Sequence, residues 1–261
     1  MAFLRPSHDR WCRPLHRHPP GRCSCLHPSE PPKRPDPAIY SQEEQLTLGL
    51  APTWNPDDIT TNQRRPWTLL PESQATVQNL STEASAINTL VHFYMSPFGI
   101  GTLRTLLSSQ LVNLAPGQQQ LLTFPLTQAL LAGDQRVGAH VVIDHPHDVR
   151  RINNRGSQTV FGVFTTDVGR NLQFQFPVVN NSASPRLITL AVLANELAAA
   201  VQPAARNFAP WEQIQATVTA QVPPGLHGVP GAEVRKDITI IGWGPGGTLI
   251  DGLTFVVRID D

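Results

Sequence analysis

The stretch NLQFQFPVV, residues 171–179, carries the clearest strand signal of the chain. Gln173 and Gln175 are polar, and apolar side chains occupy the alternating positions Leu172, Phe174, Phe176 and Val178. Because successive side chains of a β-strand point to opposite faces, this alternation predicts a strand with one buried and one exposed face. We therefore expect Phe174 to anchor a hydrophobic core.

The same period of two recurs along the chain on both sides of this stretch. Alternating runs, separated by turn residues, cover residues 73–79, 86–95, 122–126, 137–143, 214–222, 238–243 and 248–259. Phe93 lies on the apolar face of one of them and is expected to anchor a second core. Many short strands at regular spacing are typical of β-sandwiches. The sequence thus predicts an all-β fold of two tandem immunoglobulin-like, Greek-key β-sandwich domains.

Length and composition agree with two all-β domains. The chain has 261 residues, enough for two domains of about 100 to 120 residues, each with its own core. Charged residues make up 15%, below the average of about 25%, and the 25 prolines and 18 glycines suit a fold with many turns. We place the domains at residues 39–158 and 159–261. The apolar run 159–164 either closes the first domain or continues into the second, and a shared strand would join them rigidly.

Residues 1–38 differ from the rest of the chain. They contain nine prolines, seven Arg or Lys and three acidic residues, without a periodic apolar face. Such a segment cannot bury enough surface to offset its ordering entropy, so we predict a disordered basic tail. All three cysteines, Cys12, Cys23 and Cys25, lie in it, so neither domain can hold an inter-sheet disulfide. The remaining body carries more acidic than basic residues, which argues against a nucleic-acid partner.

Two segments have patterns that differ from those of the clear strands. Leu46, Leu48 and Leu50 alternate with other residues and predict a strand near the start of the first domain. Residues 187–193 read as a buried strand, although the apolar residues there and beyond also fit helical spacing. We expect a strand followed by one or two helical turns around Ala198 to Ala200.

Residues 75–154 resemble the bacterial CARDB domain, an immunoglobulin-like module associated with cell adhesion. The similar features are a short strand that ends at Asn79, a strand at residues 90–94, the turn LAPGQ at residues 114–118 and a loop that ends in the pair Asn153 and Asn154. The sequence departs from the family after Asn79, where Leu80 stands in place of the usual Gly, and before the Asn pair, where Arg residues replace acidic ones. The second half is similar in outline. The resemblance implies an adhesive or assembly module without catalytic residues.

A cluster of imidazole and carboxylate groups follows the run 137–143. The end of a strand and the loop after it could bring such groups onto one Ca²⁺ or Zn²⁺ ion. These candidate cation ligands are His140, Asp144, His145, His147 and Asp148. A polar loop that caps the sandwich is the alternative. A second candidate zinc set in the tail comprises Cys12, His16, Cys23 and Cys25, in a spacing that matches no known zinc module. We expect no organic cofactor.

Sequence motifs of common enzymes are absent. The chain contains no G-x-S-x-G elbow, H-E-x-x-H helix or Walker loop, and the GPGG at residues 244–247 reads as a hairpin turn. Trp54, Trp67, Trp211 and Trp243 could form a carbohydrate platform or could pack in cores and turns. We therefore expect no catalytic residues.

The sequence leaves three functions open. The first is a structural, adhesive or assembly protein that binds protein partners or itself through sandwich edges, as part of a larger surface or particle. The second is an accessory module that binds a carbohydrate or a metal-bridged partner, and the third is an enzyme of unfamiliar type built on the His/Asp cluster. We see no membrane span and no recognisable signal peptide, while the resemblance to CARDB favours a cell-surface or particle location.

Overall fold

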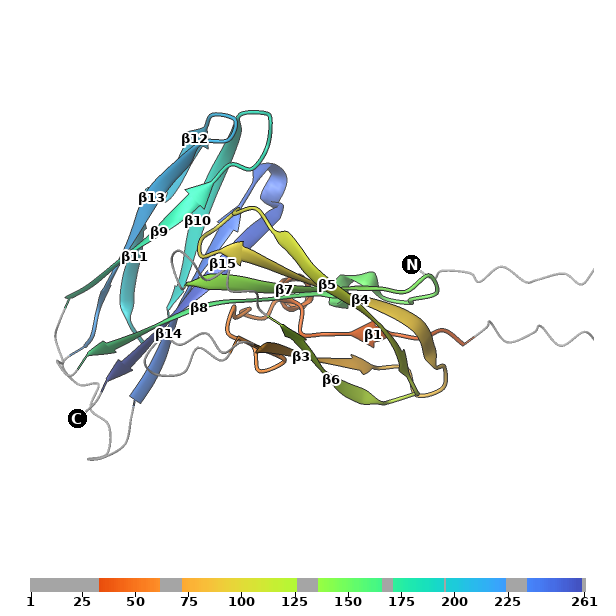
Figure 1. The fold of residues 1–261 in the computed structure, drawn as a ribbon. Coiled ribbons are helices and arrows are strands. Elements are labelled where there is room, and N and C mark those ends of the chain that lie inside the picture. The colour runs from red at the N-terminus through yellow and green to blue at the C-terminus, as the bar shows by residue number, and fades with distance from the viewer. Residues whose placement is uncertain are drawn as a thin grey trace, which may run out of the picture. The chain divides into compact units, whose positions relative to one another are not determined.

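Two layers of strands face each other in each half of the molecule (Figure 1). Buried hydrophobic side chains fill the space between the layers. The computed structural model describes residues 33–61, 72–125, 136–165, 171–194, 196–223 and 234–259, all within one compact unit, Lys33–Asp261. The strands are β1 Pro37–Ala38, β2 Ile59–Thr60, β3 Glu72–Asn79, β4 Ala86–Pro97, β5 Thr105–Leu114, β6 Gln119–Pro125, β7 Val137–Asp144, β8 Arg155–Thr165, β9 Asn171–Val179, β10 Arg186–Ala194, β11 Ala198–Gln202, β12 Ala205–Phe208, β13 Gln213–Gln221, β14 Val234–Trp243 and β15 Leu249–Ile259. The helix α1 spans Gln42–Thr47, and short 3-10 turns cover Arg151–Asn153 and Pro245–Gly247. The all-β prediction is confirmed.

One eight-stranded sheet runs through both halves, in the order β12-β10-β14-β15-β8-β7-β4-β5. A four-stranded sheet of β1, β2, β3 and β6 packs on its β4, β5 and β7 side, and a three-stranded sheet of β11, β13 and β9 packs on its β10, β14 and β15 side. The first core stacks Phe93 on Phe124, with ring centroids 4.0 Å apart. The second gathers aromatic rings around Phe255, including Phe174 at 4.8 Å. Phe93 and Phe174 are both buried, as predicted.

The strand β8 belongs to both halves. Its residues 155–159 pair antiparallel with β7, and its residues 160–165 pair in parallel with β15 (Figure 1). The apolar run 159–164 therefore continues from one half into the other. The predicted boundary between residues 158 and 159 falls inside this strand, and the division into two domains remains a prediction. Phe98 and Ile100, which follow β4, lie in the second core, so the first half contributes to both.

The two halves repeat one turn network. The strand pair β3 and β4 is joined through Asn79, and β9 and β10 are joined through Asn180; both side chains are buried. The amide nitrogen of Asn79 donates to the carbonyl of Ala115 at 3.3 Å, and that of Asn180 donates to the carbonyl of Ala209 at 2.8 Å. Asn79 and Asn180 also begin the two N-x-S patterns NLS and NNS, which match the acceptor pattern for N-glycosylation. Because both amides are buried and hydrogen-bonded, these patterns form structural turns and not accessible glycan acceptors in the folded chain.

A second part of this network is visible in the sequence. NLAPGQQ at residues 113–119 corresponds to NFAPWEQ at residues 207–213, between β5 and β6 and between β12 and β13. The Gln118 side chain accepts from the Ala115 N–H at 2.8 Å, and the Glu212 side chain accepts from the Ala209 N–H at the same distance. The strands β9, β10 and β12 to β15 therefore repeat the order of β3 to β8, with β11 added and, among the described residues, without counterparts of β1 and β2.

Three expectations from the sequence need correction. Order begins before residue 39, because β1 pairs with β3 and the Arg34 guanidinium donates to the carbonyls of His147 and Asp148. The predicted tail is thus too long by residues 33–38, and residues 1–32 lie outside the described residues. Residues 42–47 form α1 rather than a strand, because the Ser41 hydroxyl accepts from the Glu44 N–H as an N-cap.

The third correction concerns the expected helical turns around Ala198 to Ala200. These residues belong to β11, which pairs antiparallel with residues 217–221 of β13. Alanine favours helix in isolation, but hydrogen bonding and packing against a neighbouring strand override that propensity here.

Candidate functional site

The predicted cation ligand His140 lies inside the molecule. It is 1% exposed, and its ring nitrogens Nε2 and Nδ1 bond to the hydroxyls of Ser96 at 2.9 Å and Ser157 at 2.8 Å. Burial, and secondarily the nearby charge of Arg104, hold the pKa of His140 well below its usual 6.5. The imidazole is therefore neutral at pH 7, and both of its nitrogens are occupied by serines of β4 and β8.

The other predicted ligands from this loop point to different partners. Asp144 is exposed, whereas His145 Nε2 bonds to the carbonyl of Ile87 at 3.0 Å and His145 Nδ1 accepts from the His147 N–H. The Asp148 carboxylate accepts from the Arg150 N–H at 2.9 Å and from the Asn154 amide at 2.6 Å. Within the described ranges, no three or more His, Cys, Asp or Glu side chains are placed to hold a metal ion. The tail set of Cys12, His16, Cys23 and Cys25 lies outside the described residues.

Ser157 and His140 have the outline of a nucleophile and a base, because Ser157 also lines a pocket. An acting base must take up a proton, and a carboxylate normally stabilises the resulting imidazolium. Here the second ring nitrogen faces the hydroxyl of Ser96, and Arg104 disfavours a further positive charge. We interpret the three side chains as a polar bridge between β4, β7 and β8.

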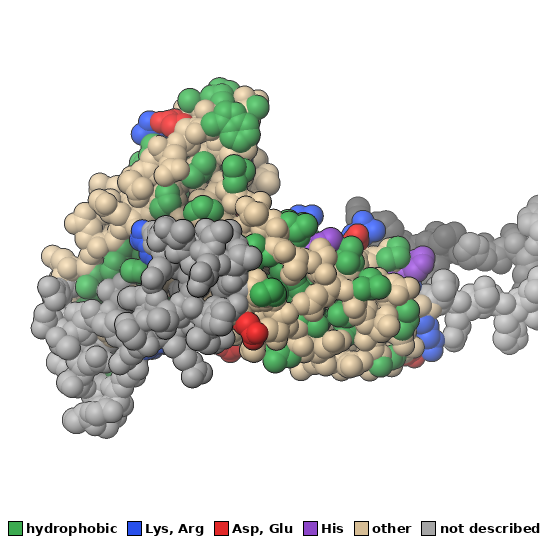
Figure 2. Space-filling view, viewed as in Figure 1, with side chains coloured by type: hydrophobic (Ala, Val, Ile, Leu, Met, Phe, Trp, Pro, Cys, Tyr) green, Lys and Arg blue, Asp and Glu red, His purple; other side chains and the backbone are tan. Residues whose placement is uncertain are grey.

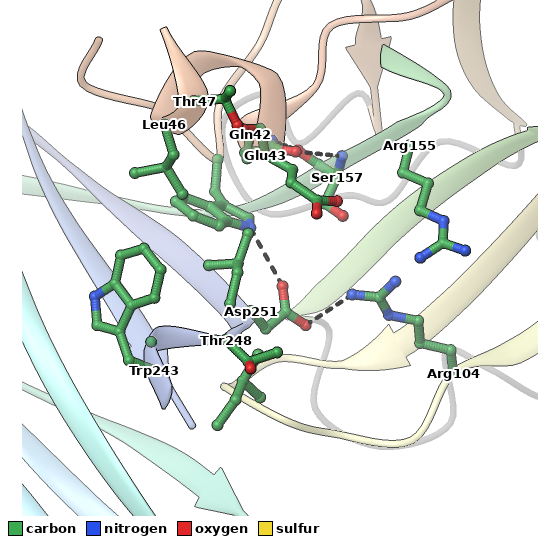
Figure 3. Close-up of a pocket in the computed structure, with 14 residues that line it drawn as sticks. Gln42, Glu43, Leu46, Thr47, Arg104, Arg155, Ser157, Trp243, Thr248 and Asp251 are labelled. Atoms are coloured by element: carbon green, nitrogen blue, oxygen red, sulfur yellow. Dashed lines mark hydrogen bonds and ion pairs between the residues drawn. The ribbon is translucent and has the colours of Figure 1, made fainter. Parts of the chain in front are cut away.

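The pocket beside Ser157 is a cavity of about 610 Å³ (Figure 3). It lies between α1, the start of β8 and the turn that joins β14 to β15. Its lining residues are Gln42, Glu43, Leu46, Thr47, Trp54, Arg104, Arg155, Ser157, Trp243, Gly247, Thr248, Leu249, Ile250 and Asp251. Small-molecule sites span about 300–1,000 Å³, so the cavity is large enough for a ligand.

Asp251 is the most enclosed charge of the pocket. Its carboxylate accepts from the indole N–H of Trp54 at 3.2 Å and from the Gly252 N–H at 2.9 Å, and it forms an ion pair with Arg104 at 3.3 Å. Burial raises the pKa of Asp251, and the Arg104 charge and these hydrogen bonds oppose that rise. The carboxylate in turn fixes the direction of the Arg104 side chain toward the pocket (Figure 3).

Gln42 of α1 and Trp54, which line the pocket, bond to the edge of β8 where that strand has no neighbouring strand. At Ser157, β8 pairs with β7 on one side only, because its pairing with β15 on the other side begins at residue 160. The Gln42 side-chain amide accepts from the Ser157 N–H at 3.1 Å and donates to its carbonyl at 2.6 Å, as a neighbouring strand would. The Thr159 N–H donates to the carbonyl of Trp54 at 2.8 Å. These bonds hold α1 and Trp54 over the sheet.

The four tryptophans of the proposed carbohydrate platform are dispersed. Trp54 is 1% exposed and packs on Gly252, while Trp243 lines the pocket. Trp211 is 60% exposed and has φ +60°, at the position that Gly117 occupies in the equivalent turn. Trp67 lies outside the described residues. Trp54 and Trp243 both line the pocket, but Trp54 is almost fully buried and Trp211 does not line it. The three described tryptophans therefore do not form one exposed platform.

The two ends of the eight-stranded sheet differ sharply. We call the strand β5 with its exposed side chains Leu106 and Leu111 the β5 edge; β5 pairs with β4 only, among the strands that the structure describes. It is ten residues long and carries no charged residue or proline. The equivalent strand β12 has four residues, and its Arg206 forms an ion pair with Glu212. Charges and short length normally protect edges from pairing, so β12 is protected and the β5 edge is not.

Hydrophobic side chains continue from the β5 edge across the outer face of the sheet. Leu111 lies beside Leu90 of β4, and Leu106 lies beside Tyr94. Figure 2 shows hydrophobic side chains scattered among uncharged polar ones over this half of the molecule, with few charged groups. The surface could therefore receive an added strand and cover its leucines at the same time.

No family model matches the chain, and no curated protein matches it. Partly similar solved structures include a family 123 glycoside hydrolase from Clostridium perfringens, with 9% identity over 39% of this chain and 23% of that one and a TM-score of 0.30. The Escherichia coli chaperone DraB has 16% identity over 38% and 50%, with a TM-score of 0.25. Elastase-activated alpha-2-macroglobulin of E. coli has 10% identity over 89% and 22%, with a TM-score of 0.29. The chain spans half or less of the length of these three, and likeness of this extent assigns no function.

In the part of the chain that the structure describes, no helix is long and apolar enough to span a membrane. Sequence reasoning missed the Asp251 pocket, whose residues come from α1, the segment after β4, β8 and the last hairpin. Trp54 and Asp251 are 197 positions apart in the sequence, and no local sequence pattern predicts their contact. The repeated NxAP turn, in contrast, was present in the sequence and could have located the β5 edge and its counterpart.

Proposed function

We propose that the protein is a non-catalytic assembly protein whose copies pair through the β5 edge. The observation that carries this proposal is the contrast between the equivalent ends of one sheet: four residues with an ion pair at β12, and ten uncharged residues at β5. A long, uncharged edge with exposed leucines is the kind of surface that pairs with another strand.

The expected occupant is the β5 edge of a second copy. Two-fold symmetric contacts use the same patch on both partners, and an antiparallel pair of identical strands satisfies this requirement. Because β5 carries no charge, two copies meet without electrostatic repulsion. The pairing would continue the eight-stranded sheet of one copy into that of the other and would cover Leu106 and Leu111, which are 51% and 65% exposed. A partner protein with its own strand is the alternative occupant.

In this proposal each half is an immunoglobulin-like Greek-key domain, and the two domains meet within the shared strand β8. The repeated turn network and the two hydrophobic clusters support two equivalent halves. The resemblance of residues 75–154 to CARDB domains supports an adhesive or assembly role rather than catalysis. Protein binding, and not turnover of a substrate, is then the activity of the chain.

The test is the mass of the full chain in solution, measured by light scattering over a range of concentrations. We expect a dimer for the natural protein and a monomer for Leu111→Lys, because each copy would bring a charge into the strand pair. Leu48→Lys is the matched control, since Leu48 is 63% exposed at the end of α1, outside any edge. It should leave the dimer intact.

A natural chain that is monomeric at every concentration would overturn self-pairing and leave a different partner as the occupant. A dimer that persists in both Leu111→Lys and Leu106→Lys would place the contact elsewhere. Both leucines are exposed, so the melting temperature of each variant should match that of the natural chain and separate lost pairing from lost folding.

A further inference from the structure

The Asp251 pocket combines two guanidinium groups with an aromatic wall (Figure 3). Arg104 is held by Asp251 at 3.3 Å, and its side chain remains 36% exposed. Arg155 is exposed, and its main chain pairs with Val142 of β7. Its guanidinium group forms no hydrogen bond or ion pair with the residues that the structure describes. Guanidinium groups form paired, directional hydrogen bonds with carboxylates, so this wall is suited to a carboxylate group of a ligand.

The opposite wall is suited to a ring with an apolar C–H face, which can pack on an indole. Trp243 lines that side of the cavity, across from the two arginines, and Leu46 and Ile250 also contribute to the lining (Figure 3). Hydroxyl oxygens of Thr47 and Thr248 are available there as acceptors, because each hydroxyl already donates to a main-chain carbonyl. The lining is more polar than that of a typical drug-like site, which favours a ligand with many hydroxyl groups.

We propose that this pocket binds an acidic sugar, a uronate residue of a glycan. The carboxylate would lie against Arg104 and Arg155, the ring against the indole of Trp243, and the hydroxyl groups against Thr47 and Thr248. This site is separate from the β5 edge, so the proposal stands independently of self-assembly.

Glu43 provides a test of the charge of the ligand. Its carboxylate also lines the cavity and belongs to α1, on the same side as Arg155 in Figure 3. Asp251 is already compensated by Arg104, so Glu43 is the negative charge that opposes an anionic ligand. Glu43→Gln should therefore strengthen the binding of a uronate, whereas a site for a cationic or neutral ligand would be weakened or unchanged.

The experiment is calorimetric titration of the full chain with galacturonate and glucuronate disaccharides, their uncharged methyl esters, and inorganic phosphate. We expect at least one of the two acids to bind, its ester to bind at least about tenfold more weakly, equivalent to about 1.4 kcal/mol, and phosphate to give no heat. Absence of binding by both acids would overturn the proposal. Equal binding of acid and ester would remove the role of the arginines, and equal binding of phosphate would show a plain anion site.

Substitutions in the pocket test which residues bind the acid. Arg155→Gln and Trp243→Leu should each weaken binding of the acid by about tenfold or more, while Glu43→Gln strengthens it. Arg235→Gln is the matched control, because Arg235 is exposed near the other end of β14. Binding unchanged in Arg155→Gln would overturn the assignment. Melting temperatures should be recorded for Trp243→Leu, and Arg155→Gln gives an independent answer if that variant folds poorly.

Discussion

Replacement of the two buried turn asparagines tests whether the halves are structurally equivalent. In Asn79→Ala, the carbonyl of Ala84 loses a hydrogen bond of 2.8 Å, and those of Leu114 and Ala115 lose bonds of 3.2 and 3.3 Å. Each buried polar group left without a partner costs about 1–3 kcal/mol. Because the longer bonds contribute less, we expect a loss of about 2–4 kcal/mol in the free energy of unfolding.

Asn180→Ala should cost a similar amount. Its amide donates to the carbonyls of Ser184 at 2.9 Å and Ala209 at 2.8 Å, which are two short bonds in place of one short and two long ones. For a chain of this size, 1 kcal/mol shifts the melting temperature by about 2–4 °C, so each variant should melt roughly 5–15 °C below the natural protein. Asn207→Ala is the control, because Asn207 is exposed on β12.

Scanning calorimetry and urea denaturation give both quantities. A melting temperature within error of that of the natural protein, for either asparagine variant, would show that its hydrogen bonds do not stabilise the fold by this amount. A large loss for Asn79→Ala beside none for Asn180→Ala would refute the equivalence of the two turns. A loss in the control would point to effects outside the turn network.

The other predictions concern the cores, a buried base and a tight turn. Phe93→Ala and Phe174→Ala should each cost about 3–5 kcal/mol in urea denaturation, with Gln173→Ala near neutral; a natural-like Phe variant would contradict the assigned strand faces. Because the pKa of His140 is lowered in the folded state, only the unfolded state gains this proton below pH 6.5, and stability should fall by up to about 1.4 kcal/mol per pH unit there. That slope should be smaller in His140→Gln. Gly117→Ala should cost about 1 kcal/mol because φ is +69°, and no loss would mean that the turn relaxes.

Strand existence was predictable wherever one face of a strand is buried and the other meets water. Residues 171–179 alternate because β9 packs one face on the second core, and the structure confirms that strand. The prediction was wrong at Leu46, Leu48 and Leu50, where a period of two coincides with a capped helix of six residues. A helix that short shows less than two turns of its own periodicity, so the N-cap at Ser41 was the better signal.

Burial was harder to predict for side chains on the outer face of a sheet. His140 alternates with the core residues of β7, a pattern that predicts a side chain on the outer face of the strand. It does lie on the other face of the sheet, but Ser96 and Ser157 from the neighbouring strands bond to it and the face is covered there. Covering depends on contacts between distant segments, as between Gln42 and Ser157, which strand periodicity does not contain. The Asp251 pocket could not be predicted for the same reason, because its lining residues come from segments far apart in the sequence.

The order of the eight-stranded sheet is mirrored about the contact of β15 with β8, because β12, β10, β14 and β15 on one side correspond to β5, β4, β7 and β8 on the other. A mirrored order around a parallel central pair fits a two-fold rotation about an axis along the strands, as in a symmetric dimer. β8 and β15 are the last strands of the two halves, and they pair in parallel. Duplication and fusion of a gene for such a dimer would yield this chain with its central contact already formed. The two outer edges would have been identical at the moment of fusion. Mutation could then alter one edge without the other, and the shortened, charged β12 beside the uncharged β5 is the divergence that such a history permits.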